Sequence, residues 1–184
     1  MPTPVDSVTD QSSTTPTPTA GPSSQPSGAP TKEPATNRPL VYVVPGRFAG
    51  EPAVQGLQRK YPLYFRALVL RDPKVVADNF PAYFYADTEA QIQIARRNGL
   101  VMMPPGSIVV RNVEQRPFGV VRISSCRSQR TEFWNKDARR WTRSAPQGSP
   151  DVIDMIRRGD GWTMYRWLQP VPKPFSCAGV RYPA

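Results

Sequence analysis

The chain has 184 residues and a formal charge of +10, because 24 lysines and arginines outnumber 14 aspartates and glutamates, and it contains two cysteines and no histidine. The absence of histidine excludes Ser-His-Asp and Cys-His catalysis and ligation of a metal by imidazole, and two cysteines are too few for a zinc finger. No phosphate loop or dinucleotide fingerprint occurs either, so the sequence predicts no catalytic residue, no metal and no cofactor.

The first 38 residues differ in composition from the rest of the chain. Residues 1–38 are rich in proline, serine and threonine and contain no aromatic side chain, so they offer little to bury and are predicted to form a disordered arm. Residues 39–184 are predicted to form one basic domain that ends in a proline-rich tail over about 169–184. The N-terminus lacks the basic and apolar regions of a secretory signal. We therefore expect a protein of the cytoplasm, or of the interior of a virus or phage particle.

The first half of the basic domain alternates strands and helices. Short apolar runs bounded by turn residues predict strands over 40–44, 63–70 and 81–85. One helix is predicted to start at Glu51-Pro52, because proline is favoured in the first turn. A second helix is predicted over 88–98, where Asp87 is a suitable N-cap and Gly99 a suitable C-terminal stop.

The second half of the domain reads mainly as strands. They are predicted over 100–103, 108–113, 118–125, 131–134 and 139–142, and a last strand or short helix over 162–168. Between them, Ser149-Pro150 followed by Asp151 has the signature of a helix start and predicts a helix that ends at Gly159. The fold class expected is α+β, a single compact domain with a mixed or mostly antiparallel sheet and about three helices.

A basic segment from residue 122 to residue 143 is the best candidate for a binding surface. Its candidate contact residues are Arg122, Arg127, Arg130, Trp134, Lys136, Arg139, Arg140, Trp141 and Arg143. Arginine presents a planar fork that matches phosphate or carboxylate, and an exposed aromatic ring can stack on a base. The alternative is an ordinary antiparallel pair with the tryptophans in the core and the arginines in solvent. The positive charge can also reflect codon usage, since arginine greatly outnumbers lysine.

The acidic residues suggest chemistry only under one condition. Asp151 and Asp154 are expected early in the predicted helix, where they face its positive end. A deep pocket that held two or more of a set of five carboxylates would instead favour an enzyme without histidine. The five are Asp72, Asp87, Glu114, Asp151 and Asp154.

The two cysteines, Cys126 and Cys177, belong to no metal or redox motif. In an intracellular protein they are expected to be thiols. The alternatives are a disulfide that fixes the proline-rich tail to the domain, and a reactive thiol.

These features together predict a non-enzymatic structural or assembly protein. Its basic domain is expected to dock on an acidic partner surface in a larger complex, such as a virion or phage particle, with the arm as a tether. The alternative is a nucleic-acid-binding protein that uses the 122–143 segment through phosphate contacts. No apolar stretch approaches the roughly 20 residues of a membrane-spanning helix, so no membrane span is expected.

Overall fold

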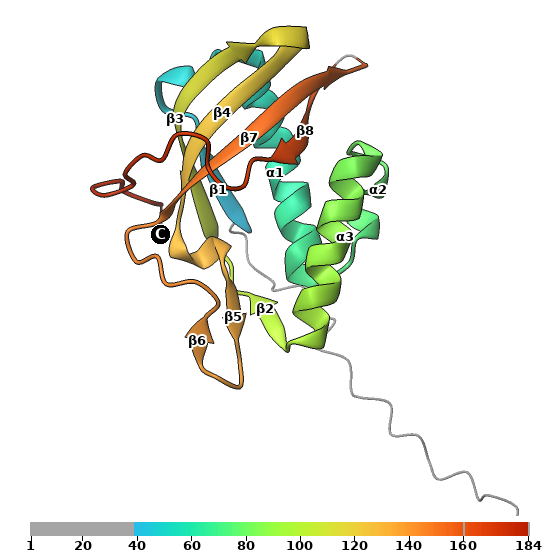
Figure 1. The fold of residues 1–184 in the computed structure, drawn as a ribbon, viewed down its shortest axis with the longest axis vertical. Coiled ribbons are helices and arrows are strands. Elements are labelled where there is room, and N and C mark those ends of the chain that lie inside the picture. The colour runs from blue at the N-terminus through green and yellow to red at the C-terminus, as the bar shows by residue number, and fades with distance from the viewer. Residues whose placement is uncertain (1–38, 160, 184) are drawn as a thin grey trace, which may run out of the picture. The chain divides into compact units, whose positions relative to one another are not determined.

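A five-stranded sheet that curls around one long helix forms the folded body (Figure 1). The computed structural model describes residues 39–159 and 161–183, which lie in one unit running from Pro34 to Ala184. In the described ranges the fold is a single α+β domain with three helices and a mixed sheet, as predicted, and it also has a small antiparallel sheet that was not predicted. The arm predicted over 1–38 lies outside the described residues.

The large sheet has the strand order β1-β3-β4-β7-β8. Strand β1 pairs in parallel with β3 and the other neighbours pair antiparallel. Both edge strands, β1 and β8, contact the long helix α1, so the sheet wraps around that helix. The strands are β1 (Val41–Val44), β3 (Gly106–Arg116), β4 (Val120–Arg127), β7 (Ser149–Arg158) and β8 (Gly161–Trp167).

A second, three-stranded sheet has the order β2-β5-β6 and is antiparallel. Its strands are β2 (Leu100–Met102), β5 (Phe133–Asn135) and β6 (Arg140–Trp141). Strands predicted over 100–103, 108–113, 118–125, 131–134 and 139–142 all correspond to strands of the structure, with ends shifted by a few residues. Strand β6 is shorter than predicted and contains neither Arg139 nor Thr142.

Helix α1 spans Pro52–Leu70 and contributes many of the buried side chains of the core. Its buried side chains recur every three or four residues and include Leu57, Tyr61, Tyr64 and Leu68. This helical period continues through the segment 63–70, so the strand predicted there is wrong. Local alternation between residues 63 and 70 was a weaker signal than the periodicity over the whole helix, which accommodates Pro62 in its interior.

Helix α3 spans Ala82–Arg97 and follows the short helix α2 (Lys74–Ala77). The predicted helix over 88–98 is confirmed, but it begins six residues earlier, with Pro81 at its N-cap. The strand predicted over 81–85 is therefore wrong. Asp87 lies inside the helix rather than at its start, one turn before Gln91, and the amide Nε2 of Gln91 donates a 2.9 Å hydrogen bond to its carboxylate.

The helix predicted from Ser149 to Arg158 is wrong, because this segment is strand β7. β7 lies between β4 and β8 and is buried over most of its length. A strand covered on both faces has a continuous apolar pattern that resembles a short buried helix. Asp151 and Asp154 are consequently not at a helix end; both are buried, and both face arginines of neighbouring strands.

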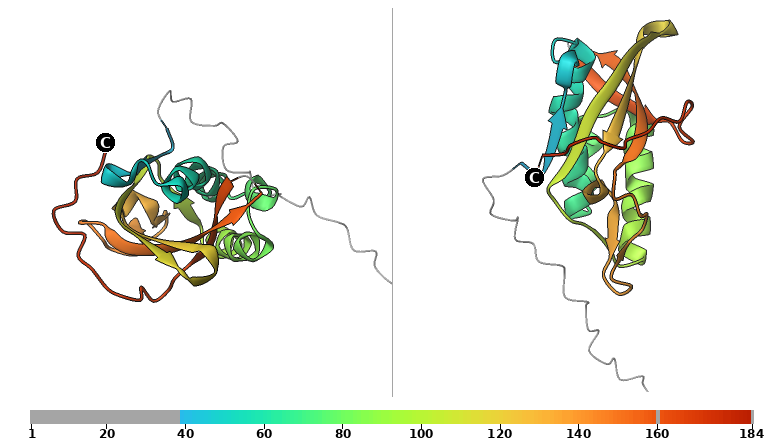
Figure 2. Two further views of the ribbon diagram at one scale, coloured as in Figure 1. Left: turned by 90° about the horizontal axis from the view of Figure 1, so that it is seen from above. Right: turned by 90° about the vertical axis from the view of Figure 1, so that its left-hand side faces the viewer.

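The C-terminal segment after β8 runs along the face of the sheet that points away from the helices (Figure 2). A disulfide joins Cys177 in this segment to Cys126 in β4. The prediction of free thiols is therefore wrong, and the disulfide given as an alternative is present. Disulfides persist mainly in oxidising compartments, which weighs against the expected cytoplasmic or intravirion setting; that setting stays a prediction. No helix in the described part of the chain is long and apolar enough to cross a membrane.

Candidate functional site

A cavity of about 500 Å³ lies between helices α1 and α3 and the inner face of the sheet. Helix α1 contributes Tyr64 and Leu68 to its wall, and the opposite wall comes from the ends of β4, β7 and β8. The polar and aromatic residues that line it are Tyr64, Tyr83, Asp87, Gln91, Arg127, Thr131, Glu132, Phe133, Arg143, Asp151, Trp167 and Gln169. Few of them are adjacent in the sequence, so only the fold brings them together.

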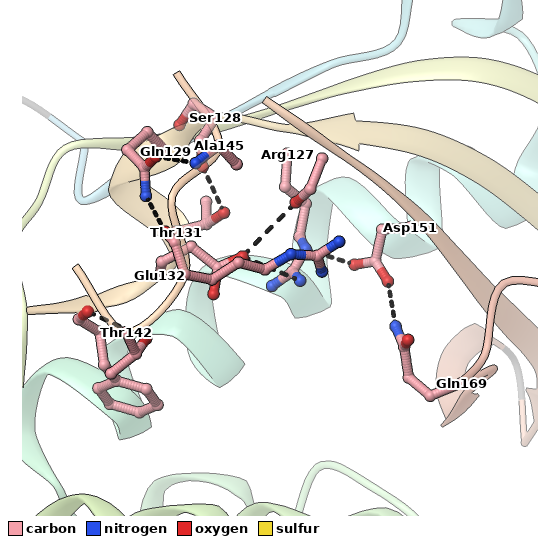
Figure 3. A network of polar contacts seen from close by, with 12 residues as sticks. Arg127, Ser128, Gln129, Thr131, Glu132, Thr142, Ala145, Asp151 and Gln169 are labelled. Atoms are coloured by element: carbon pink, nitrogen blue, oxygen red, sulfur yellow. Dashed lines mark hydrogen bonds and ion pairs between the residues drawn. The ribbon is translucent and has the colours of Figure 1, made fainter. Parts of the chain in front are cut away.

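Three charged residues form a buried cluster on the sheet side of the cavity (Figure 3). The guanidinium of Arg127 lies between two carboxylates, with Nε 2.7 Å from Asp151 Oδ2 and Nη2 3.4 Å from Glu132 Oε1. The exposed side-chain fractions are 18% for Arg127, 13% for Glu132 and 2% for Asp151. One guanidinium thus forms ion pairs with two carboxylates, and the cluster carries a net negative charge when all three groups are ionised.

Further hydrogen bonds fix Asp151 in place. Its Oδ1 accepts from the backbone N–H of Val152 at 3.1 Å and from Nε2 of Gln169 at 3.4 Å. Burial raises the pKa of Asp151 to about 6, although Arg127 and the Val152 N–H act in the opposite direction. Asp151 therefore titrates near neutral pH, which is unusual for an aspartate and typical of residues at functional sites.

The hydrogen bonding within the cluster is incomplete. Arg127 Nε and Asp151 Oδ2 form an ion pair by distance, but their geometry is not that of a hydrogen bond, and neither atom has another hydrogen-bond partner among the described residues. Trp167 Nε1, in the wall of the same cavity, is also buried without a hydrogen bond in the described part of the chain. Buried polar atoms are rarely left in this state, and each one calls for an explanation.

A second polar chain faces this cluster from the helices. The hydroxyl of Tyr64 donates a 3.1 Å hydrogen bond to Gln91 Oε1, and Gln91 Nε2 donates to Asp87 Oδ2. Burial raises the pKa of Tyr64 above its usual range, so its hydroxyl stays protonated and serves as a donor. The cavity therefore has ionic or polar groups on two sides, and apolar surface from Leu68, Met102 and Phe133.

The structure divides the predicted basic surface into three places. Arg127 belongs to the cavity, as does Arg143, which is exposed at its edge. Arg122 lies on the opposite face of β4, where Nε and Nη2 donate to the two oxygens of Asp154 at 2.8 and 3.2 Å. Arg166 of β8 donates to the same carboxylate at 3.0 Å. Arg122 and Arg127 are thus committed to ion pairs and do not contribute to a continuous cationic surface.

The remaining predicted contact residues lie on or beside the ribbon formed by β5 and β6. Lys136, Arg139 and Arg140 are exposed around its turn, and Arg130 is exposed in the preceding segment. Trp134 and Trp141 are cross-strand partners in this ribbon, with ring centroids 5.2 Å apart in an edge-to-face arrangement. Each tryptophan is half-buried against the other, which leaves less of their ring faces for stacking on a base.

Of the five carboxylates singled out in the sequence, Asp87 and Asp151 line the cavity together. Asp154 is held in its own ion-pair cluster, and Asp72 and Glu114 lie elsewhere. The roles of Tyr64, Gln91, Glu132, Trp167 and Gln169 were not predicted. Recognition of β7 as a strand would have given one signal for the site, because a charged residue inside a buried strand needs a partner on a neighbouring strand.

No family model matches the chain, and a search of curated proteins finds no match. The described residues contain no group of three or more acidic or cysteine side chains arranged to hold a metal ion.

Proposed function

We propose that the folded body binds a small organic molecule in the cavity between α1, α3 and the sheet. The observation that carries the proposal is the buried cluster of Arg127, Asp151 and Glu132 on the cavity wall, with its incomplete hydrogen bonds. Burial of three charged groups costs stability unless they are fully paired. Such a cluster is favourable where a bound ligand completes the pairing of its charged groups.

The size of the cavity supports this proposal. Ligand sites are concave, with volumes of roughly 300–1,000 Å³. This cavity has about 500 Å³, and its wall combines aromatic rings with a majority of polar and charged side chains, so it suits a polar or charged ligand. Asp151, whose pKa is raised to about 6 by burial, could also exchange a proton with the ligand near neutral pH.

A fragment screen with a cavity-filling variant tests the proposal. The full chain is screened against a library of aromatic and polar fragments by saturation-transfer NMR, and binding is located by ¹H–¹⁵N shift changes. Gln91 is half-buried and lines the cavity from α3, so Gln91→Trp should fill the cavity. Because the change also removes the hydrogen bonds of Gln91 with Tyr64 and Asp87, circular dichroism of the variant checks that the fold is retained. Gln93 is exposed on the same helix and is outside the cavity, so Gln93→Trp is the matched control.

The expected result is that fragments shift the resonances of lining residues such as Asp151 and Trp167 in the native chain and in Gln93→Trp. Binding should be lost in Gln91→Trp. The proposal is wrong if no fragment shifts these resonances, or if both variants bind equally well. Spectra followed over hours would show whether a bound fragment is converted to a product.

A second proposed function rests on the β5–β6 ribbon. Lys136, Arg139 and Arg140 are exposed around its turn and form no ion pair with other residues in the described ranges. This surface supports docking on an acidic partner within a larger assembly, the function expected from the composition, with nucleic acid as the alternative partner.

Charge reversal tests the ribbon separately from the cavity. The triple variant K136E/R139E/R140E is compared with R59E/R97E/R157E, which makes the same change in net charge at exposed arginines outside the ribbon. The probes are a 20-bp DNA duplex and poly-L-glutamate. Ribbon docking predicts that only the first triple weakens binding, with a salt slope for DNA reduced by about three. Equal loss in both triples would mean that net charge alone drives binding.

A further inference from the structure

Acidic residues are over-represented in the cavity wall relative to basic ones. Of the ten acidic residues in the described ranges, three line the cavity, whereas only two of the 22 basic residues from position 39 onward do so. The three are Asp87, Glu132 and Asp151, and the two are Arg127 and Arg143. Three carboxylates against two guanidinium groups leave one unmatched negative charge, inside a chain whose formal charge is +10.

Because the cavity carries an excess of negative charge in a basic protein, we infer that its ligand is an organic cation, an amine with a compact apolar or aromatic body. The inference rests on the proposed ligand-binding function and adds the chemical class of the ligand. A positive group in the cavity neutralises the unmatched charge, whereas a carboxylate or phosphate would add to it.

Acceptor atoms for an ammonium group are present in the cavity wall. Asp151 Oδ2 forms a 2.7 Å ion pair with Arg127 Nε that lacks hydrogen-bond geometry, so this oxygen keeps acceptor capacity for a further donor. Glu132 is contacted through Oε1 only, by Arg127 and by the hydroxyl of Ser149, and Asp87 is contacted through Oδ2 only, by Gln91. The second oxygens of Glu132 and Asp87 accept nothing from residues that the structure describes. An ammonium has three N–H donors and can use such oxygens.

The aromatic residues of the cavity fit the same class of ligand. Tyr64, Tyr83, Phe133 and Trp167 all line it, and Tyr83 is 63% exposed at its mouth. Ring faces attract cations within about 6 Å of the centroid, and the attraction is strongest where water is excluded. Arg127 already lies 6.0 Å from the centroid of the Trp167 ring, so this wall accommodates a positive charge. Leu68 and Met102 give the apolar body of the ligand a surface for contact.

Three probes of nearly equal shape and different charge test the inference. Tryptamine is cationic, tryptophol is neutral and indole-3-propionate is anionic at neutral pH, and each fits a cavity of about 500 Å³. Titration of the full chain followed by ¹H–¹⁵N NMR should give an affinity for tryptamine about tenfold higher than for tryptophol, with indole-3-propionate weakest. The same titrations are repeated with two variants.

Asp87→Asn is the informative variant, since Asp87 is exposed on α3 and its loss leaves the core unchanged. It should lower the affinity for tryptamine about threefold to tenfold and leave the affinity for tryptophol unchanged. Asp78→Asn changes an exposed aspartate outside the cavity; it is the matched control and should change neither affinity. Tryptophol or indole-3-propionate binding as tightly as tryptamine overturns the cation class while the cavity keeps its proposed function. The two failures remain distinct, because absence of binding by all three probes and by the whole fragment library would overturn the proposed function itself.

Discussion

Strands β4 and β7 carry an ion cluster on each face of the sheet, and the two clusters differ in charge balance and in hydrogen bonding. Asp151 and Asp154 are three residues apart on β7, so their side chains point to opposite faces of the sheet. On the outer face, Asp154 accepts two well-formed hydrogen bonds from Arg122 and one from Arg166. On the inner face, Asp151 shares Arg127 with Glu132, and the closest ion pair lacks hydrogen-bond alignment.

The difference between the clusters separates a structural role from a binding role. The outer cluster joins three neighbouring strands, has two cations for one carboxylate, and leaves no oxygen of Asp154 without a donor. The inner cluster has two carboxylates for one cation and borders a cavity. We therefore expect changes to the outer face to act on stability, and changes to the inner face to act on binding and on its pH dependence.

The largest expected effect is loss of the disulfide on the outer face. Cys126 and Cys177 are 51 residues apart in the sequence, and a cross-link over that separation stabilises a domain by about 4 kcal/mol in the chain-entropy description. The variant C126A/C177A should lose about that free energy of unfolding in urea denaturation, while its affinity for tryptamine stays unchanged. A loss of tryptamine binding as well would contradict the separation of the two faces.

Asp154→Asn is the next largest change. Asp154 is 1% exposed, and its replacement leaves Arg122, which is 17% exposed, without a carboxylate. Removal of one partner of a buried ion pair leaves an uncompensated charge, and we expect a loss of about 3 kcal/mol in the free energy of unfolding. Arg166 is half-exposed and can turn to solvent, which limits the cost. A stability equal to that of the native chain would show that the outer cluster is dispensable.

The sequence predicted the fold class well and two kinds of element poorly. Strands with turn residues at both ends, such as β3 and β4, were found because their signals are local. Strand β7 was missed because Ser149-Pro150-Asp151 matches a helix start, and pairing with β4 and β8 overrides that local preference. Helix α1 was cut in two because the segment after Pro62 also alternates.

The candidate site was beyond sequence reasoning for a related reason. Arg127 was noted as a member of a cationic surface. Asp151 was noted at a helix start and, with Asp87, among five carboxylates that a pocket could bring together, and those two do line the cavity. The pairing of Arg127 with Asp151 depends on β4 and β7 being neighbours, which no local pattern encodes. Tyr64 and Gln91 come from two helices whose packing sets the helix side of the cavity. Long-range contacts of this kind follow from the tertiary fold alone.

Stability should depend on pH through Asp151 on the inner face. Its pKa is about 6 in the folded protein, above the value of an unfolded aspartate, so the folded state holds the proton more tightly. The contribution of this group to stability is then greatest below about pH 4 and is lost as pH rises through 6. The full loss is about 3 kcal/mol, of which about 2 kcal/mol falls between pH 4.5 and 7. Urea denaturation at pH 4.5 and 7 should show this change in the native chain relative to Asp151→Asn. The same pH profile in both proteins would mean that Asp151 titrates normally.

The smallest expected effect, and the most specific for the inner face, is a pH dependence of cation binding. Glu132, Arg127 and Arg143 are the charged groups that act on the pKa of Asp151. Protonation of Asp151 removes one negative charge from the cavity, so tryptamine should bind about fivefold more weakly at pH 5 than at pH 7.5. Tryptophol should show no such change, and Asp151→Asn should flatten the tryptamine profile. Tighter binding of tryptamine at low pH would contradict the cation site, because a cation should lose affinity when the cavity loses a negative charge.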